Sequence, residues 1–281
     1  MGAKTKIEWC DATWSPVTGC LNSCPYCYAR GIARRFGTLD ANSGFCDETM
    51  KEIITDRGVI AEMSRRLNGE PYPYDFVPTF HRYLLEKPQR MKKPRTIFVC
   101  SMADLFGGWV PDEWIQEVFK ACESAPQHRY LFLTKNPDRY QWINNEDGEA
   151  GEPNLALCGT PYLLGASVTN QEQLDTAYGS AADWISVEPM RGHLEFDGAS
   201  TYCGRYAQDE AARWSWIVIG AETGNSKDKA VPKREWIDEI VGCSKHCKTP
   251  IFMKDSLAPI MGEENMIREL PFWGRKGMWR D

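Results

Sequence analysis

The stretch "TIFVCSMADLFGGWVPDEWIQEVFKACESAPQHRYLFLTKN", residues 96–136, contains two short apolar runs with a segment of helical character between them. Each run is rich in β-branched and aromatic residues and has the length and near-continuous hydrophobicity of a strand buried on both faces. The segment between them has Pro111 near its start, acidic residues in its first turn and Pro126 just past its end, which are signals of helix boundaries. The stretch therefore predicts a strand, a helix and a second strand.

The same alternation recurs along most of the chain. Helical segments at residues 170–183 and 232–248 separate further apolar runs. Alternating buried strands and helices predict a parallel sheet with right-handed crossovers. We therefore expect an α/β fold, a full or partial (β/α) barrel of about six or seven parallel strands with helical insertions. The strands are expected at residues 11–19, 96–104, 129–136, 162–170, 184–190, 216–224 and 250–256.

Two stretches interrupt the repeat, and neither contains a linker or low-complexity tract that would mark a second domain. We expect a single domain over residues 1–281, with insertions near residues 37–95 and 191–213. The first insertion is predicted to include a helix at residues 48–69. The Trp-rich C-terminal tail, residues 270–281, interleaves aromatic and basic residues, which is typical either of packing or of single-stranded nucleic-acid binding.

The composition is that of a soluble globular protein. Apolar residues make up 42% of the chain and charged residues 26%, and no apolar run is long enough to cross a bilayer. The N-terminus lacks the apolar core of a signal peptide, so a cytoplasmic location without membrane association is expected. In a reducing cytoplasm the 11 cysteines are better explained by metal binding or catalysis than by disulfides.

Three of these cysteines stand close together in "VTGCLNSCPYCYAR", residues 17–30. Cys20, Cys24 and Cys27 have the spacing C-x3-C-x2-C, with no fourth cysteine nearby. Thiolates this close can bind three metals of a cubane iron–sulfur cluster and leave the fourth iron without a protein ligand. Catalytic zinc sites likewise keep one coordination position for a small molecule. The spacing therefore favours a metal centre that accepts an outside ligand.

Two other metal centres are compatible with the same cysteines. A structural zinc site could recruit a distant fourth ligand such as Cys10 or Cys46, and the protein would then be a zinc-stabilised binding module rather than an enzyme. A cluster that only transfers electrons would also need a fourth protein ligand. The zinc alternative predicts that loss of the three cysteines unfolds the protein, because structural zinc supplies folding energy.

The cysteine segment resembles the signature loop of the radical S-adenosylmethionine superfamily. The resemblance rests on C-x3-C-x2-C with an aromatic residue, Tyr26, just before the third cysteine, and on its position after the first expected strand. The strand–helix pattern is similar to the superfamily core over most of the chain. The opening "KIEWCDATWSPVTGC", residues 6–20, resembles a phage-associated branch of that superfamily.

The resemblance implies a reaction and its cofactors. Cys20, Cys24 and Cys27 would hold a [4Fe-4S] cluster, and the amino and carboxylate groups of S-adenosylmethionine would bind the iron that lacks a protein ligand. An electron donor such as a flavodoxin or ferredoxin would reduce the cluster. Reductive cleavage of S-adenosylmethionine would then give methionine and a 5'-deoxyadenosyl radical, which abstracts a hydrogen atom from the substrate.

Polar residues follow the expected strands at their carboxyl ends, where a parallel barrel opens onto the same face as the cysteine segment. By the resemblance, Ser101 and Asp104 are candidates to contact the methionine amino group. Lys135 and Lys254 are candidates to meet its carboxylate. Each polar residue could instead cap the helix that follows it. The cofactor-binding candidates are Ser101, Asp104, Lys135, Ser167, Asn170, Glu222 and Lys254.

For four of the strand-end residues we expect a more specific role. Ser167 and Asn170 resemble residues that bind the ribose of the cofactor. Gly220 would allow a ring to approach the backbone closely. Cys100, near the same face, could donate a hydrogen atom to a product radical, although a free cysteine is more often a small core residue.

Charge and resemblance are the only guides to the substrate. The net charge of −6 argues against binding nucleic acid through bulk electrostatics, but two basic runs, residues 29–36 and 87–95, could form a local face. Such runs are more commonly solvated surface. A nucleic-acid base or nucleotide is the favoured substrate, and a peptide or small metabolite is the alternative.

Overall fold

The computed structural model describes residues 5–37, 50–66, 72, 74–141, 160–196, 213–224 and 228–271. The chain divides into two compact units, Met1–Tyr162 and Leu163–Asp281. Most of the second predicted insertion and nearly all of the Trp-rich tail lie outside the described residues. The single-domain organisation stays a prediction.

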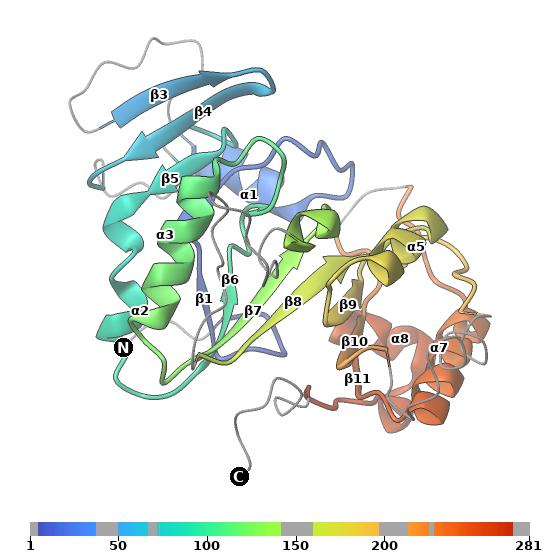
Figure 1. The fold of residues 1–281 in the computed structure, drawn as a ribbon. Coiled ribbons are helices and arrows are strands. Elements are labelled where there is room, and N and C mark those ends of the chain that lie inside the picture. Colours follow the sequence, from blue (N-terminus) through green and yellow to red (C-terminus); the bar gives the residue numbers. More distant parts are fainter. Residues whose placement is uncertain are drawn as a thin grey trace. The chain divides into compact units, whose positions relative to one another are not determined.

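Three parallel strands form the centre of the N-terminal unit (Figure 1). They are β1 (Ala12–Trp14), β6 (Thr96–Val99) and β7 (Arg129–Thr134), with β6 in the middle. Helix α3 (Asp112–Glu123) crosses from β6 to β7 and buries an apolar side on the sheet, where Phe119 stacks on Phe132 with ring centroids 4.9 Å apart. The strand–helix–strand prediction for residues 96–136 is confirmed.

A second sheet lies in the same unit and corrects a prediction. Its strands, in spatial order, are β2 (Val17–Thr18), β5 (Thr79–His81), β4 (Gly58–Met63) and β3 (Met50–Thr55). The helix predicted at residues 48–69 is therefore wrong, since β3 and β4 form an antiparallel hairpin.

The sequence of this hairpin explains the error. Ile53, Ile54, Val59 and Ile60 are β-branched residues on either side of a two-residue connection, Asp56 and Arg57. Paired strands with such a short loop are a hairpin pattern, and β-branched residues favour strands over helices. The order of charged and apolar residues in this stretch also fits the spacing of a helix, so the periodicity predicted the wrong element.

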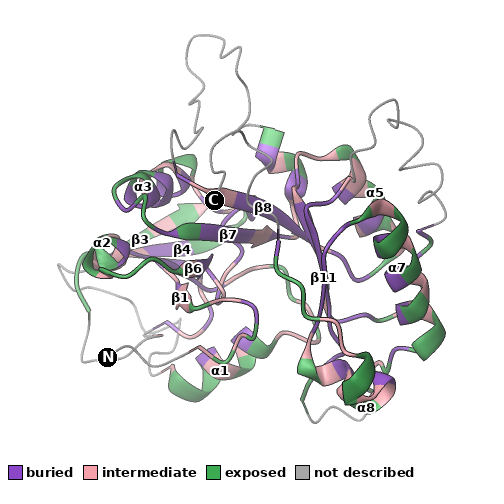
Figure 2. Cartoon of the chain, turned by 90° about the horizontal axis from the view of Figure 1, so that it is seen from below, coloured by how far each residue is buried: buried purple, intermediate pink, exposed green. Residues whose placement is uncertain are grey.

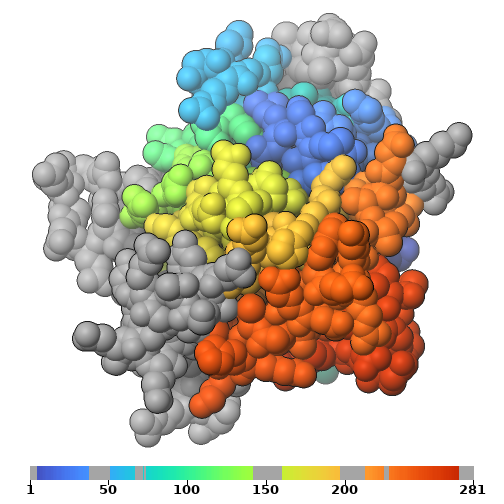
Figure 3. Space-filling model, turned by 90° about the vertical axis from the view of Figure 1, so that its right-hand side faces the viewer, coloured from blue at the N-terminus to red at the C-terminus, as the bar shows by residue number. Residues whose placement is uncertain are grey.

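Four parallel strands belong mainly to the C-terminal half of the chain. They are β8 (Tyr162–Ser167), β9 (Trp184–Val187), β10 (Trp216–Ile219) and β11 (Ile251–Met253). Helices α5 (Gln171–Gly179) and α7 (Arg234–Cys247) connect or follow them at the predicted places. Figure 3 shows the exterior of this unit, where the orange segment includes α7.

All seven parallel strands fall in the order β1-β6-β7-β8-β9-β10-β11. The predicted α/β fold with about six or seven parallel strands is confirmed, with seven strands, and the order has two outer strands, β1 and β11, as a partial barrel requires. The remaining short elements are α1 (Tyr28–Phe36), η1 (Arg82–Leu84), α2 (Lys87–Arg90), η2 (Pro137–Tyr140), η3 (Asp255–Leu257), α8 (Ala258–Met261) and η4 (Glu263–Asn265).

Burial follows these elements closely. The strands of the parallel sheet from β6 to β11 are largely buried, whereas α3 and α7 each have one buried and one exposed side (Figure 2). Trp184 and Trp216, on adjacent strands, are fully buried with ring centroids 5.1 Å apart. None of the helices that the structure describes has the length and apolar character needed to traverse a bilayer.

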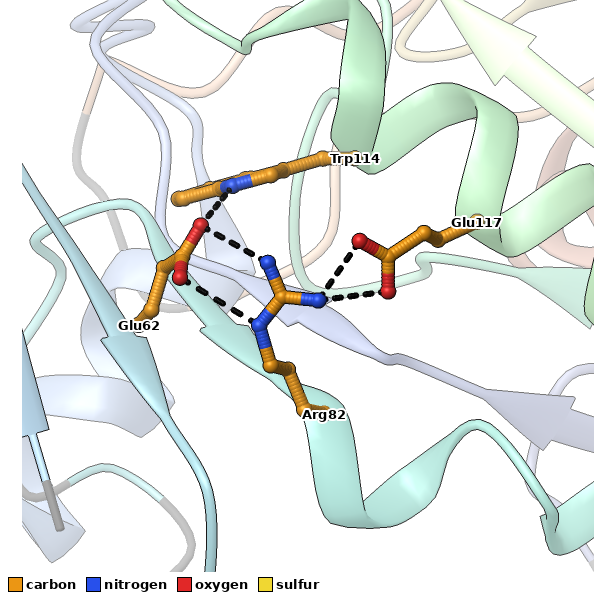
Figure 4. A network of polar contacts seen from close by, with 4 residues as sticks. All are labelled: Glu62, Arg82, Trp114 and Glu117. Atoms are coloured by element: carbon orange, nitrogen blue, oxygen red, sulfur yellow. Dashed lines mark hydrogen bonds and ion pairs between the residues drawn. The ribbon is translucent and has the colours of Figure 1, made fainter.

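A polar network joins the hairpin sheet to α3 (Figure 4). The Arg82 guanidinium donates to Glu62 on β4 at 3.1 and 3.2 Å and to Glu117 on α3 at 2.5 and 2.6 Å. The Trp114 indole donates to the same Glu62 carboxylate at 2.6 Å. The network thus fixes the inserted sheet against the helix that covers β6 and β7.

Candidate functional site

The three-cysteine loop, residues 20–27, joins β2 to α1 and enters beside the carboxyl end of β6. The Gly19 N–H donates to the Met102 carbonyl at 3.0 Å, and the Cys20 N–H donates to the Phe76 carbonyl at 3.2 Å. Gly19 has a φ of +80°, and a Cβ there would lie 2.3 Å from the Val77 carbonyl oxygen. Only glycine fits this entry point, because it alone tolerates both the positive φ and the close backbone contact.

The three thiols are free and partly buried. Two of their sulfurs accept backbone hydrogen bonds: the Asn22 N–H donates to Cys20 Sγ and the Arg30 N–H to Cys27 Sγ, both at 3.4 Å. Cys27 thereby caps the N-terminus of α1. Amide donors and a helix N-terminus both favour a negatively charged sulfur, which is the form that binds metal.

Cys20 is strongly affected by its surroundings. Burial raises the pKa of its thiol to about 12, opposed by the backbone N–H of Asn22 and assisted by the negative charge of Asp104. In the metal-free protein this sulfur is therefore protonated at neutral pH. A metal that binds here must displace the proton, so binding is favoured by higher pH.

Asp104 is the principal side-chain anchor of the loop. It is 5% exposed, and each of its carboxylate oxygens accepts two hydrogen bonds. Oδ1 accepts from the Phe106 N–H at 3.2 Å and from the Thr134 hydroxyl at 2.6 Å. Oδ2 accepts from the Asn22 side chain and from the Lys135 N–H, both at 3.0 Å. The carboxylate therefore ties the cysteine loop to the segments that follow β6 and β7.

Tyr26 in the cysteine loop and Tyr28 at the start of α1 contact the segments that follow β6 and β7. The Tyr28 hydroxyl donates to the Ser101 carbonyl at 2.7 Å. The Lys135 ammonium lies 5.4 Å from the centre of the Tyr26 ring, in a cation–π contact. Three predicted site residues, Ser101, Asp104 and Lys135, are thus brought to the cysteine loop. Their contact with S-adenosylmethionine stays a prediction.

Cys100 lies inside the core directly after β6. It is 3% exposed, and burial raises the pKa of its thiol to about 12. Its φ of +55° is in the left-handed region that side-chain-bearing residues seldom adopt, and its N–H donates to the Trp14 carbonyl at 2.8 Å. This environment favours the core-residue interpretation. Radical quenching by Cys100 stays a prediction.

In the C-terminal unit, Asn170 has the capping role that the sequence left open. Its side-chain oxygen accepts from the Gln173 N–H at 2.9 Å at the start of α5. Gln173 accepts in return from the Thr169 N–H at 2.7 Å. This reciprocal arrangement satisfies free N–H groups at the helix start. Ser167 is half-buried at the end of β8, in register with Ser186 of β9.

An ion pair spans the carboxyl ends of β9, β10 and β11. Lys254, after β11, pairs with Glu188, after β9, and the two side chains are 18% and 26% exposed. Gly220, after β10, lies between them: a Cβ there would be 3.1 Å from Glu188 and 3.2 Å from Lys254. The glycine therefore makes room for the pair, where the sequence predicted the approach of a ring. Glu188 was not among the predicted site residues, and its strand-end position was the only signal for it.

Glu222 completes the polar groups of this unit. It is 8% exposed, accepts from the Ala230 N–H at 3.2 Å and lies 3.5 Å from an Arg191 nitrogen. The arginine offsets part of the cost of burying this carboxylate. The predicted contact of Glu222 with the cofactor stays a prediction.

The donor set at the cysteine loop can be compared with the two kinds of metal centre. Among the described residues, no group of three or more histidine, cysteine, aspartate or glutamate side chains surrounds a point that could hold one ion. Zinc needs its ligands around one such point, whereas each cysteine of a cubane cluster binds a different iron. The three thiols could each bind one iron of a cluster, and the cluster itself stays a prediction. Cys46 lies outside the described residues.

Comparison with known families gives one match. Residues 4–259 match a family described as a protein of unknown function, DUF5131. The chain belongs to the DUF5131 family. The matched range of this DUF5131 protein includes the cysteine loop and all seven strands of the parallel sheet. Neither the curated proteins nor the solved structures contain a match to it.

Proposed function

We propose that this DUF5131 protein is a radical S-adenosylmethionine enzyme. The observation that carries the proposal is the loop with Cys20, Cys24 and Cys27, which follows the first strand of a parallel α/β sheet and is anchored at the ends of β6 and β7. When bound, a [4Fe-4S] cluster supplies the electron that splits S-adenosylmethionine into methionine and a 5'-deoxyadenosyl radical, which takes a hydrogen atom from the substrate.

The residues of this chain have distinct roles in the proposal. The three cysteine sulfurs, as thiolates, hold the cluster. The N–H groups of Asn22 and Arg30 donate to two of these sulfurs and stabilise their negative charge. Asp104 and Tyr28 hold the loop on the sheet. An external electron donor, such as a flavodoxin or ferredoxin, is required because the reaction consumes an electron.

A nucleic-acid base or nucleotide is the substrate class we propose. Its support is helix α1, which begins directly after Cys27 and exposes Arg34 and Arg35. The second basic run, residues 87–95, lies before β6 and so at the opposite, amino end of the strands. Of the two basic runs, the one in α1 is therefore the one that adjoins the cysteine loop. A peptide or small metabolite is the alternative.

The decisive experiment is anaerobic reconstitution with iron and sulfide, followed by reduction with S-adenosylmethionine present. We expect about four irons per chain, a change in the electron paramagnetic resonance spectrum when S-adenosylmethionine is added, and release of 5'-deoxyadenosine. The matched control replaces Cys20, Cys24 and Cys27 together by alanine and abolishes all three signals. A protein that binds one zinc and releases no 5'-deoxyadenosine would rule the proposal out.

A further inference from the structure

The surroundings of Asp104 suggest more than a structural anchor. Its four donors are two backbone N–H groups, one hydroxyl and one side-chain amide, and all of them are neutral. Lys135 contributes only its backbone N–H, since its ammonium lies over the Tyr26 ring. In the described part of the chain, no cation forms an ion pair with this buried carboxylate. Its negative charge is therefore solvated by dipoles and not cancelled.

The position of Asn22 connects this carboxylate to the cysteines. Asn22 lies between Cys20 and Cys24, and its side chain donates to Asp104 while its backbone N–H donates to Cys20 Sγ. The hydrogen bond to Asp104 therefore holds the residue whose amide faces the sulfur. Loss of that bond would free the segment that joins two of the three thiols.

We infer that Asp104 is a positioning residue of the proposed cluster site, acting in two ways. It fixes the Cys20–Cys24 segment through Asn22 before any metal binds, and it places an uncancelled negative charge beside Cys20. A nearby negative charge disfavours the addition of an electron and so lowers the reduction potential of a bound cluster. The inference rests on the proposed function, but its first effect exists in the metal-free protein.

The first test measures the metal-free loop. Asn22→Ala removes the side-chain contact, and Asp104→Asn replaces its charged acceptor by a neutral amide that also presents N–H groups to the former donors. The rates of alkylation of Cys20, Cys24 and Cys27 are followed by mass spectrometry. Because a hydrogen bond to a charged group shifts a local equilibrium by about tenfold or more, we expect about tenfold faster alkylation in both variants. Asp238→Asn, at an exposed ion pair on α7, is the control and keeps the wild-type rates.

Wild-type alkylation rates in both folded variants would overturn the positioning role. If Asp104→Asn does not fold, Asn22→Ala decides alone, because Asn22 is exposed and its replacement leaves the buried carboxylate in place. Circular dichroism establishes which variants are folded. This test needs no cluster, so its result stands even if the proposed function fails.

The second test measures the charge effect on the reconstituted protein by redox titration. Asp104→Asn removes the charge, and we expect a midpoint potential more positive than that of the wild type. Asn22→Ala keeps the charge, so its potential stays closer to the wild-type value. Equal potentials in Asp104→Asn and wild type would overturn the electrostatic part of the inference. A wild-type protein that takes up no cluster would instead overturn the proposed function.

Discussion

At the scale of single residues, His81 is the clearest case of an ionisable group kept neutral by the fold. It is 1% exposed on β5, and its ring nitrogens lie 2.8 Å from the Thr18 hydroxyl and 3.3 Å from the Tyr83 hydroxyl. Burial lowers the pKa of its imidazole from 6.5 to about 4. Thr18 leads directly into Gly19, so this buried contact adjoins the start of the cysteine loop.

This shift predicts a loss of stability in mild acid. The unfolded chain binds a proton at His81 below pH 6.5, whereas the folded protein binds it only near pH 4, so stability is complete above 6.5 and falls as the pH falls toward 4. Between pH 7.5 and 5 we expect a loss of about 2 kcal/mol from this group. Denaturant unfolding of wild type and His81→Gln at both pH values measures it. Equal losses in the two proteins would contradict the assignment.

Replacement of two glycines near the cysteine loop by alanine is expected to change the free energy of unfolding in opposite directions. Gly19→Ala forces a Cβ to within 2.3 Å of the Val77 carbonyl oxygen at a φ of +80°, and we expect it to lower the free energy of unfolding by about 2 kcal/mol or more. Gly31→Ala, in helix α1, meets nothing within 4 Å and is expected to raise it by up to about 1 kcal/mol. Urea unfolding of both variants tests the pair, and a neutral Gly19→Ala would refute the steric argument.

At the scale of elements, the hairpin sheet depends on Arg82. Arg82→Met leaves the carboxylates of Glu62 and Glu117 facing each other without a cation. We expect the free energy of unfolding to fall by about 1–2 kcal/mol, since the arginine is partly exposed and its charge is partly screened. Arg90→Met removes only an exposed i,i+4 pair with Glu86 and is expected to cost less than about 0.5 kcal/mol. Equal effects in thermal unfolding would show that the network contributes nothing special.

The cysteine loop is held by contacts that do not involve its thiols. The Tyr28–Ser101 and Asn22–Asp104 hydrogen bonds use no sulfur atom, so we expect them to remain when Cys20, Cys24 and Cys27 are replaced together by alanine. We therefore expect the triple variant to keep the far-ultraviolet circular dichroism of the wild type. The zinc alternative predicts the opposite, because a structural zinc site is required for folding. An unfolded triple variant would favour that alternative.

The elements differ in how readily the sequence reveals them. All seven parallel strands lie within the predicted runs, because a strand buried on both faces leaves a continuous apolar signal. The β3–β4 hairpin was missed, because β3 is mostly exposed and the two strands carry a mixed pattern that two periodicities can fit. Its short connection, Asp56 and Arg57, was the better signal.

At the scale of the whole molecule, the two basic runs, residues 29–36 and 87–95, lie at different positions relative to the parallel sheet. The net charge of −6 makes any anionic ligand depend on local cations. The α1 arginines follow the cysteine loop, whereas the run at residues 87–95 precedes β6 and contacts the start of β7 through the bond from the Arg129 N–H to the Arg95 carbonyl. Substitutions in one basic run can therefore serve as the matched control for substitutions in the other.

This arrangement predicts unequal effects on nucleic-acid binding. Arg34→Gln with Arg35→Gln is expected to weaken binding of a single-stranded oligonucleotide and to lower the slope of log affinity against log salt by about one for each phosphate that is no longer neutralised. Lys92→Gln with Lys93→Gln removes the same charge and is expected to change little. Fluorescence anisotropy at several salt concentrations compares them. Equal effects, or no binding by wild type, would count against the nucleic-acid substrate.

The local pattern of the sequence was sufficient for the alternation of strands and helices and for the cysteine spacing, because both are properties of neighbouring residues. Only the folded chain reveals that Asp104 binds Asn22, 82 residues away, and that Lys254 pairs with Glu188 beside Gly220. The sequence could predict that these side chains lie at strand ends. It could not predict which partner each of them contacts. Partner choice depends on distances between segments that are remote in sequence, and no local pattern encodes those distances.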